Sequence, residues 1–153
     1  MSEFDTDLKT ATSDLERART ELLSALECLT EDDVSRGRRG GWSVREILYH
    51  VIGGERHYTN GIAFIRGRPP GKPPSEQAEL RSAADAIRML HETRAALLSA
   101  LEGIDEDTFY KLVPLSNEEG HGQTYSVLSV LENIALHDRE HTAQILAIVA
   151  TIK

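Results

Sequence analysis

Four of the chain's five prolines lie within residues 66–74, and this segment most narrowly limits how the chain can fold. Proline lacks the backbone N–H that a helix requires and its ring collides with the preceding turn, so no helix can continue through these residues. The chain as a whole is rich in the leucine, alanine, glutamate and arginine that favour helices. The sequence therefore predicts two helical halves joined by an extended crossover.

Two helices are predicted before the crossover. The first is expected at residues 8–29, where a leucine recurs every seventh residue with alanines between, as in a helix packed at a shallow angle: Leu8, Leu15, Leu22 and Leu29. Ser43 and Glu46 have the spacing of a capping box, in which each side chain bonds to the other residue's backbone N–H. This spacing predicts a second helix at residues 44–65.

Two more helices are predicted after the crossover. The third carries apolar residues at helical spacing from Leu80 to Ile104 and is expected to end near Gly103. Ser126 can cap a fourth helix, which is expected to reach almost to Lys153.

The two halves also resemble each other. Residues 22–27 recur unchanged as residues 97–102, and an aromatic-serine pair opens the second helix of each half. Two similar hairpins would make the second and fourth helices neighbours. The prediction is an all-α fold, a four-helix bundle with a long crossover between helices 2 and 3. The chain has the length of one ordinary domain, so a single domain is expected over residues 1–153.

Three histidines interrupt the inward faces of these helices. His137 and His141 are four residues apart on the predicted fourth helix, so their rings lie on one face, which is otherwise apolar. His50 lies on the inward face of the second helix. One inward histidine is usually an ordinary core residue, but three from two facing helices can hold a transition metal such as zinc or nickel. Three ligands would leave a position open to water or substrate, as catalytic sites require.

Gly53, Gly54 and Gly61 fall within the predicted second helix. Each weakens a helix by roughly 1 kcal/mol relative to alanine. Their presence indicates that another group, either a substrate or a neighbouring helix, approaches closely.

Three other residues are candidates for a role beside the histidines. Glu46 could accept a hydrogen bond from His50, although its capping role already explains it. His57 could line a pocket as an acid or base, or be an ordinary histidine near the end of the bundle. Arg94 lies on the core stripe of the third helix, where it could bind a carboxylate of a thiol cosubstrate or extend its charge to solvent. No catalytic residue is predicted.

Two segments carry a family resemblance. Residues 42–50, with Trp42-Ser43, Glu46 and His50, and residues 132–141, with His137-Asp138 and His141, resemble the DinB-like metalloprotein superfamily. The resemblance covers nearly the whole chain and implies metal ligands at His50, His137 and His141. Members of the superfamily include thiol-dependent S-transferases and isomerases that use bacillithiol, mycothiol or glutathione. By the same resemblance, a homodimer is expected.

These features leave several functions open. The leading hypothesis is a metal-dependent enzyme that transfers a low-molecular-weight thiol to a small electrophile. One alternative is a metal-dependent hydrolase, distinguished by turnover without added thiol. Another is a non-catalytic metal-binding stress-response protein, in which a fourth protein ligand would close the site.

Charge and hydropathy exclude some classes of partner. The net charge of -8 and the pI near 5.2 argue against nucleic acid, which normally requires a basic surface. No window is long and apolar enough for a membrane span, and the N-terminus lacks the basic and apolar regions of a signal peptide. The single cysteine cannot form an intrachain disulfide. A cytoplasmic protein acting on a small molecule is expected.

Overall fold

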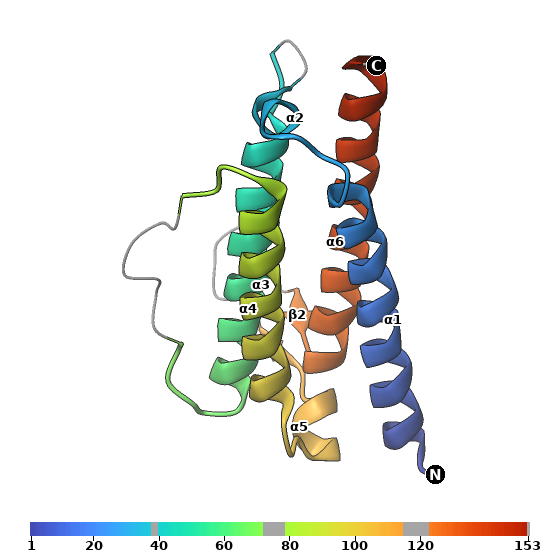
Figure 1. Cartoon of the computed structure of the whole chain (residues 1–153). Helices are drawn as coiled ribbons and strands as arrows, with labels where there is room; N and C mark the ends of the chain where they lie inside the picture. The colour runs from blue at the N-terminus through green and yellow to red at the C-terminus, as the bar shows by residue number, and fades with distance from the viewer. Residues whose placement is uncertain (38–39, 72–78, 115–122, 153) are drawn as a thin grey trace.

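A computed structural model of the protein describes residues 1–37, 40–71, 79–114 and 123–152 (Figure 1). Four long helices run alongside one another: α1 (Glu3–Leu26), α3 (Val44–Ile65), α4 (Ala83–Leu101) and α6 (Val127–Ile152). Shorter elements lie between them: α2 (Glu31–Ser35), α5 (Glu106–Tyr110), β1 (Val113–Pro114) and β2 (Thr124–Tyr125). The predicted all-α bundle is confirmed.

The helix contacts bring the two halves of the chain together. α6 packs against both α1 and α3, and α3 also packs against α4. α3 and α6 run in opposite directions, and the two chain termini lie at opposite ends of the bundle (Figure 1). The predicted second and fourth helices are therefore neighbours, as expected. No helix in the described residues combines enough length with enough apolar character for a membrane span.

α1 begins and ends earlier than predicted. Ser2 and Asp5 form a capping box, in which the Asp5 N–H donates to Ser2 Oγ at 3.1 Å, so the helix starts at Glu3. A second capping box at Thr30 starts α2, and the chain has left α1 before it. Leu29, the last leucine of the predicted stripe, therefore lies beyond the helix, where it still packs against the core.

α3 and α6 begin where the sequence predicts. In α3, the Glu46 N–H donates to Ser43 Oγ at 3.2 Å, and the Ser43 N–H donates to Glu46 Oε1 at 3.1 Å. In α6, the Ser129 N–H donates to Ser126 Oγ at 3.1 Å. These bonds satisfy N–H groups that have no partner within the helix. They fix the starting points of the two helices that carry the three histidines.

α4 starts later than predicted, because a capping box at Ser82 sets its first turn. Leu80 is fully buried but lies before the helix, and its backbone N–H donates to the Tyr49 hydroxyl at 2.8 Å. The helix ends close to the predicted position. Gly103, with φ of +70°, adopts the left-handed conformation that commonly follows a helix end.

The predicted crossover is described only in part. Residues 66–71 follow directly on α3, whereas residues 72–74 lie outside the described residues. The Arg66 side chain donates to the Ala100 carbonyl oxygen at 2.7 Å, and the Gly71 N–H donates to Asn60 Oδ1 at 3.1 Å. These two bonds hold the first part of the crossover against α4 and α3.

Three short features were not predicted: α2, α5 and the pairing of β1 with β2. The two strands are antiparallel, with Val113 opposite Tyr125 and Pro114 opposite Thr124. Phe109 of α5 is fully buried and packs in the apolar core near that helix's end of the bundle. Segments this short contain too few residues to show a helical or strand period.

The apolar core consists of two clusters, one toward each end of the bundle. The upper cluster, near α2, includes Leu22, Leu48, Leu90 and Ile145. The lower cluster, near α5, includes Leu15, Ile62, Leu97 and Ile134. Between them each long helix contributes one charged residue, and we call these four residues the charge layer: Arg19, Glu55, Arg94 and Asp138.

Candidate metal centre

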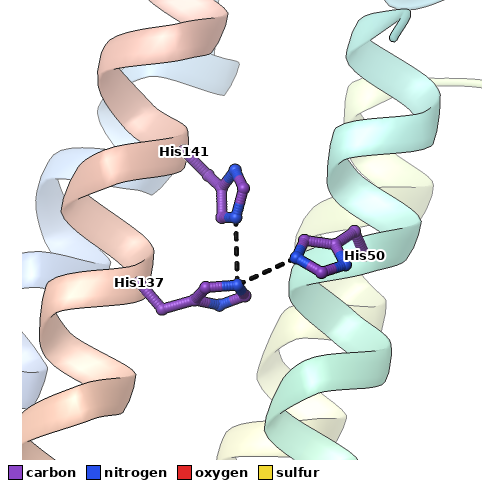
Figure 2. Close-up of side chains that lie close together, drawn as sticks. All are labelled: His50, His137 and His141. Carbon is purple, nitrogen blue, oxygen red and sulfur yellow. Dashed lines mark hydrogen bonds between the residues drawn. The ribbon is translucent and has the colours of Figure 1, made fainter.

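The three predicted histidines lie together between α3 and α6. His50 extends from α3, and His137 and His141 extend from successive turns of α6 into the same space (Figure 2). His137 Nε2 is 3.0 Å from His50 Nε2 and 3.0 Å from His141 Nε2. One ring nitrogen from each residue lies within 4.8 Å of the others. We call these three residues the histidine cluster.

The two distances from His137 Nε2 suit neighbouring ligands of one ion. With metal–nitrogen bonds of about 2.1 Å, two ligand nitrogens are about 3.0 Å apart at a right angle and about 3.4 Å apart at a tetrahedral angle. A ring nitrogen offers either one hydrogen or one lone pair, so His137 Nε2 cannot form ordinary hydrogen bonds with both neighbours. A shared cation satisfies three lone pairs at once. The cluster could therefore hold a divalent metal ion.

Gln144 fixes the orientation of one ring. Its side-chain oxygen accepts a hydrogen bond from His141 Nδ1 at 2.6 Å, which leaves the Nε2 lone pair facing the other histidines. Such an outer partner is usual for a metal-binding histidine. Gln144 was not among the residues predicted from the sequence. Its only signal was its position one helical turn after His141.

Gly54 makes room for another ring. A Cβ atom at Gly54 would lie 3.1 Å from Cε1 of His137, tighter than ordinary van der Waals contact. The close approach predicted from the helix glycines therefore occurs here, and the approaching group is the histidine itself. A Cβ at Gly53 would meet nothing within 4 Å, and one at Gly61 would meet only Tyr125 at 3.9 Å.

The surroundings of the histidine cluster favour neutral imidazoles. His141 is buried, His137 is half-buried and His50 is exposed. Loss of contact with water lowers the pKa of both His50 and His137, and the charge that His141 can carry lowers them further. Asp138 acts on His137 in the opposite direction without cancelling the effect. Because a metal binds only the unprotonated ring nitrogen, these shifts reduce competition from protons.

A pocket with a volume of about 750 Å³ opens beside the histidine cluster. We call it the Trp42 pocket; its walls include His50, His141, Trp42, Ile47, Gln144, Ala147 and Ile148. The Trp42 ring lies 5.0 Å from that of His50, between ring centres. Two of the three histidines thus face a space large enough for a small molecule, since ligand sites commonly measure about 300–1,000 Å³.

A second pocket, of about 610 Å³, lies further along the same two helices. We call it the Tyr58 pocket; its walls include Tyr58, Asn60, Thr124, Ser129 and Asn133. The Tyr58 ring centre is 6.3 Å from that of His137. The histidine cluster therefore has a pocket on each side along the α3–α6 groove.

The charge layer lies directly behind the histidine cluster, because Asp138 follows His137 in α6. Arg19 Nε donates to Asp138 Oδ2 at 2.9 Å, and Arg19 also pairs with Glu55. Arg94 Nε donates to Glu55 Oε1 at 2.7 Å, and its terminal nitrogen lies 3.4 Å from Asp138 Oδ2. Burial alone would raise the pKa of Glu55, but the two guanidinium groups outweigh it and lower the pKa from 4.5.

Arg94, one of the three further candidates, belongs to this layer. Its side chain is 12% exposed, and the carboxylates beside it are those of the protein itself, Glu55 and Asp138. Arg19, Glu55 and Asp138 were not predicted as members of a site. The sequence did offer one sign of such buried charges, a charged residue next to a position on the inward face of a helix. Arg19, for example, directly follows Ala18.

Glu46 and His57 lie outside the histidine cluster. Glu46 is exposed, and its carboxylate accepts bonds from the Ser43 backbone and hydroxyl groups. Within the described part of the chain it forms no hydrogen bond with His50. His57 is exposed on α3 and lines the Tyr58 pocket, with its ring centre 6.0 Å from that of Tyr58.

The comparison with known protein families agrees with these features. Residues 14–145 match the family model described as the DinB superfamily, a span that includes both helices of the histidine cluster. No curated protein sequence matches the chain significantly. The family match, which covers most of the chain, confirms the resemblance found in residues 42–50 and 132–141. The chain therefore belongs to the DinB superfamily.

Proposed function

We propose that His50, His137 and His141 bind one divalent transition metal, zinc or nickel, in an enzyme that transfers a low-molecular-weight thiol to a small electrophile. The main support for the metal proposal is that the Nε2 atoms of the three histidines lie close together at the wall of the Trp42 pocket. Neutral imidazoles are common ligands of both metals. The pKa shifts of His50 and His137 favour that neutral form.

A fourth coordination position on the metal, left for water or substrate, would support catalysis over storage or structural binding. Within the described residues, no fourth histidine, cysteine, aspartate or glutamate joins the histidine cluster. His50 and His141 both face the Trp42 pocket, through which a small molecule could reach the site. When bound, a metal would supply Lewis acidity, lowering the pKa of a bound thiol or water toward neutrality.

The protein's own residues would hold this site in place. Gln144 keeps the proton of His141 on Nδ1. Gly54 lets the His137 ring approach α3. Such support limits the rearrangement that metal binding requires.

The choice of thiol transfer rests on the family. Its S-transferase members are the basis for proposing a thiol cosubstrate here, and the homodimer is proposed on the same basis. A metal-dependent hydrolase and a non-catalytic metal-binding stress-response protein are the alternatives. Assays with bacillithiol, mycothiol and glutathione against the electrophile monochlorobimane separate these functions. Turnover only with thiol supports the transferase, and ester hydrolysis without thiol supports the hydrolase. The absence of both reactions supports the non-catalytic protein.

The metal proposal is tested by metal content. We expect about one zinc or nickel per chain, measured by mass spectrometry, after expression with the metal supplied. The variant His137→Ala should lose the metal, because it removes the nitrogen that lies closest to both other ligands. The matched control His57→Ala removes an exposed histidine of α3 and should retain the metal. Equal metal content in all three proteins would place the metal elsewhere, and no metal in any of them would rule the site out.

A further inference from the structure

The two pockets beside the histidine cluster differ in chemistry. The Trp42 pocket combines the indole of Trp42 with the aliphatic side chains of Ile47, Ala147 and Ile148. The walls of the Tyr58 pocket include the amide and hydroxyl groups of Asn60, Ser129 and Asn133, together with the rings of Tyr58 and Tyr125. The two ends of the same groove would therefore favour different parts of a ligand.

The histidine and glutamine side chains of the Trp42 pocket lie at one end, while Gly40 and Gly41 contribute backbone groups to its wall. His50, His141 and Gln144 lie beside the proposed metal position, and Gln144 bonds to His141. Ala147 and Ile148 lie one to two turns further along α6 from His141, away from the other two histidines. A ligand that enters this pocket would meet polar, metal-binding side chains at one end and mostly apolar side chains along the rest.

Two small side chains of α6 line the same pocket as the indole. Ala143 and Ala147 are one turn apart, and both line the pocket. Alanine at two successive turns leaves room that larger residues would fill. Trp42 is 49% exposed, so its indole can cover a bound apolar group without a rearrangement of the core.

We propose that the Trp42 pocket binds the apolar part of the substrate, a small molecule whose polar head reaches the histidine cluster and whose aliphatic or aromatic tail lies between Trp42 and Ala147. This inference rests on the proposed metal site, which would hold the polar head. It names the Trp42 pocket as the source of selectivity and Ala147 and Trp42 as the residues that set it.

A series of straight-chain hydroxamic acids tests the proposal, because each member has the same metal-binding head and a tail of different length. Binding of acetohydroxamate, butanohydroxamate and hexanohydroxamate to the zinc-loaded protein would be measured by calorimetry. We expect affinity to rise by about three- to fourfold for each methylene added, the usual gain on burying one. Trp42, the only tryptophan, gives a second readout, since its fluorescence should change as the tail binds.

Ala147→Phe fills the space for the tail. We expect this variant to bind acetohydroxamate within about twofold of the wild type and to lose the gain with chain length. Because a larger side chain at half-buried Ala147 can disturb folding, Trp42→Ala is the second variant: it removes an exposed wall and should also reduce the gain. Asn133→Phe places the same side chain in the Tyr58 pocket and should leave the chain-length dependence unchanged.

The outcomes separate this inference from the metal proposal. Zinc bound without any dependence on chain length overturns the inference and leaves the metal site intact. A gain abolished by Asn133→Phe and retained in Ala147→Phe assigns the tail to the Tyr58 pocket and also overturns it. Protein that holds no zinc in the same samples overturns both.

Discussion

Gly54 lies where the ring of His137 meets α3, and its missing side chain has a direct consequence for the histidine cluster. A Cβ atom there would lie 3.1 Å from the ring, so any larger residue requires the ring to move. Glycine costs a helix roughly 1 kcal/mol relative to alanine. At this position the loss of helix stability allows the His137 ring to pack closely against α3. His137 Nε2 lies 3.0 Å from His50 Nε2.

Gly54→Ala should therefore weaken metal binding while leaving the protein folded. A ring displaced by a few tenths of an ångström no longer matches the other two ligands, and we expect roughly tenfold weaker zinc affinity, the lower range for disturbed ligand support. Competition with a chelator of known affinity measures this change. Gly53→Ala is the matched control, since its Cβ meets nothing within 4 Å. The control should keep its zinc affinity and gain up to about 1 kcal/mol of stability. Equal zinc affinities in the two variants would contradict this role of Gly54.

The sequence predicted the three histidines but not their support. Their placement on the faces where α3 and α6 meet follows from helical spacing, which a single sequence shows directly, although His50 is exposed there. The bond from His141 to Gln144 depends on side-chain rotamers, and the contact of His137 with Gly54 depends on how far apart α3 and α6 lie. Neither quantity can be read from spacing along one helix.

At the scale of the helices, local hydrogen bonds decided which boundaries could be predicted. The start of α3 at Val44 follows from the reciprocal bonds of Ser43 and Glu46, both of which are local in sequence. The long leucine stripe gave a poorer boundary, because Leu29 remains in the core after α1 has ended. Apolar spacing reports burial, and Leu80 shows that a residue outside a helix can be buried equally well.

Ser43→Ala tests the importance of the α3 cap. The substitution leaves the Glu46 N–H without its side-chain partner, so we expect a loss of about 1 kcal/mol in the free energy of unfolding. Urea denaturation followed by circular dichroism measures it. Ser24→Ala is the control, because Ser24 is exposed within α1 and alanine favours a helix at least as well. If both variants have wild-type stability, the cap contributes little to α3.

At the scale of the whole molecule, the charge layer divides the core and joins all four long helices. Arg19 of α1 contacts Asp138 of α6 and Glu55 of α3, and Arg94 of α4 contacts the same two carboxylates. Two positive and two negative groups offset one another, and every member has partners within the layer. The sequence could not reveal this pairing, since residues separated by 119 positions meet only when the bundle forms. The layer fixes the level of Asp138 in the bundle and therefore that of its neighbour His137.

The charge layer should make the free energy of unfolding decrease at acid pH. The pKa of Glu55 in the folded protein lies below its usual value of 4.5, so the unfolded chain binds a proton more readily than the folded one. Glu55 therefore stabilises the fold fully above pH 4.5, and this contribution is lost as the pH falls through the lower, folded-state pKa. Urea denaturation at a series of pH values should show a steep loss of stability in that range.

Glu55→Gln separates the charge layer from other acid-sensitive groups. Near neutral pH the variant should be less stable by roughly 3–5 kcal/mol, because two buried guanidinium groups lose a shared carboxylate. As the pH falls below 4.5, its stability should decline less steeply than that of the wild type, so the two curves converge. Glu132→Gln removes an exposed carboxylate of α6 and controls for the loss of one negative charge. Parallel curves for the wild type and Glu55→Gln would show that the acid sensitivity originates elsewhere, and that Glu55 is equally protonated in the folded and unfolded chains.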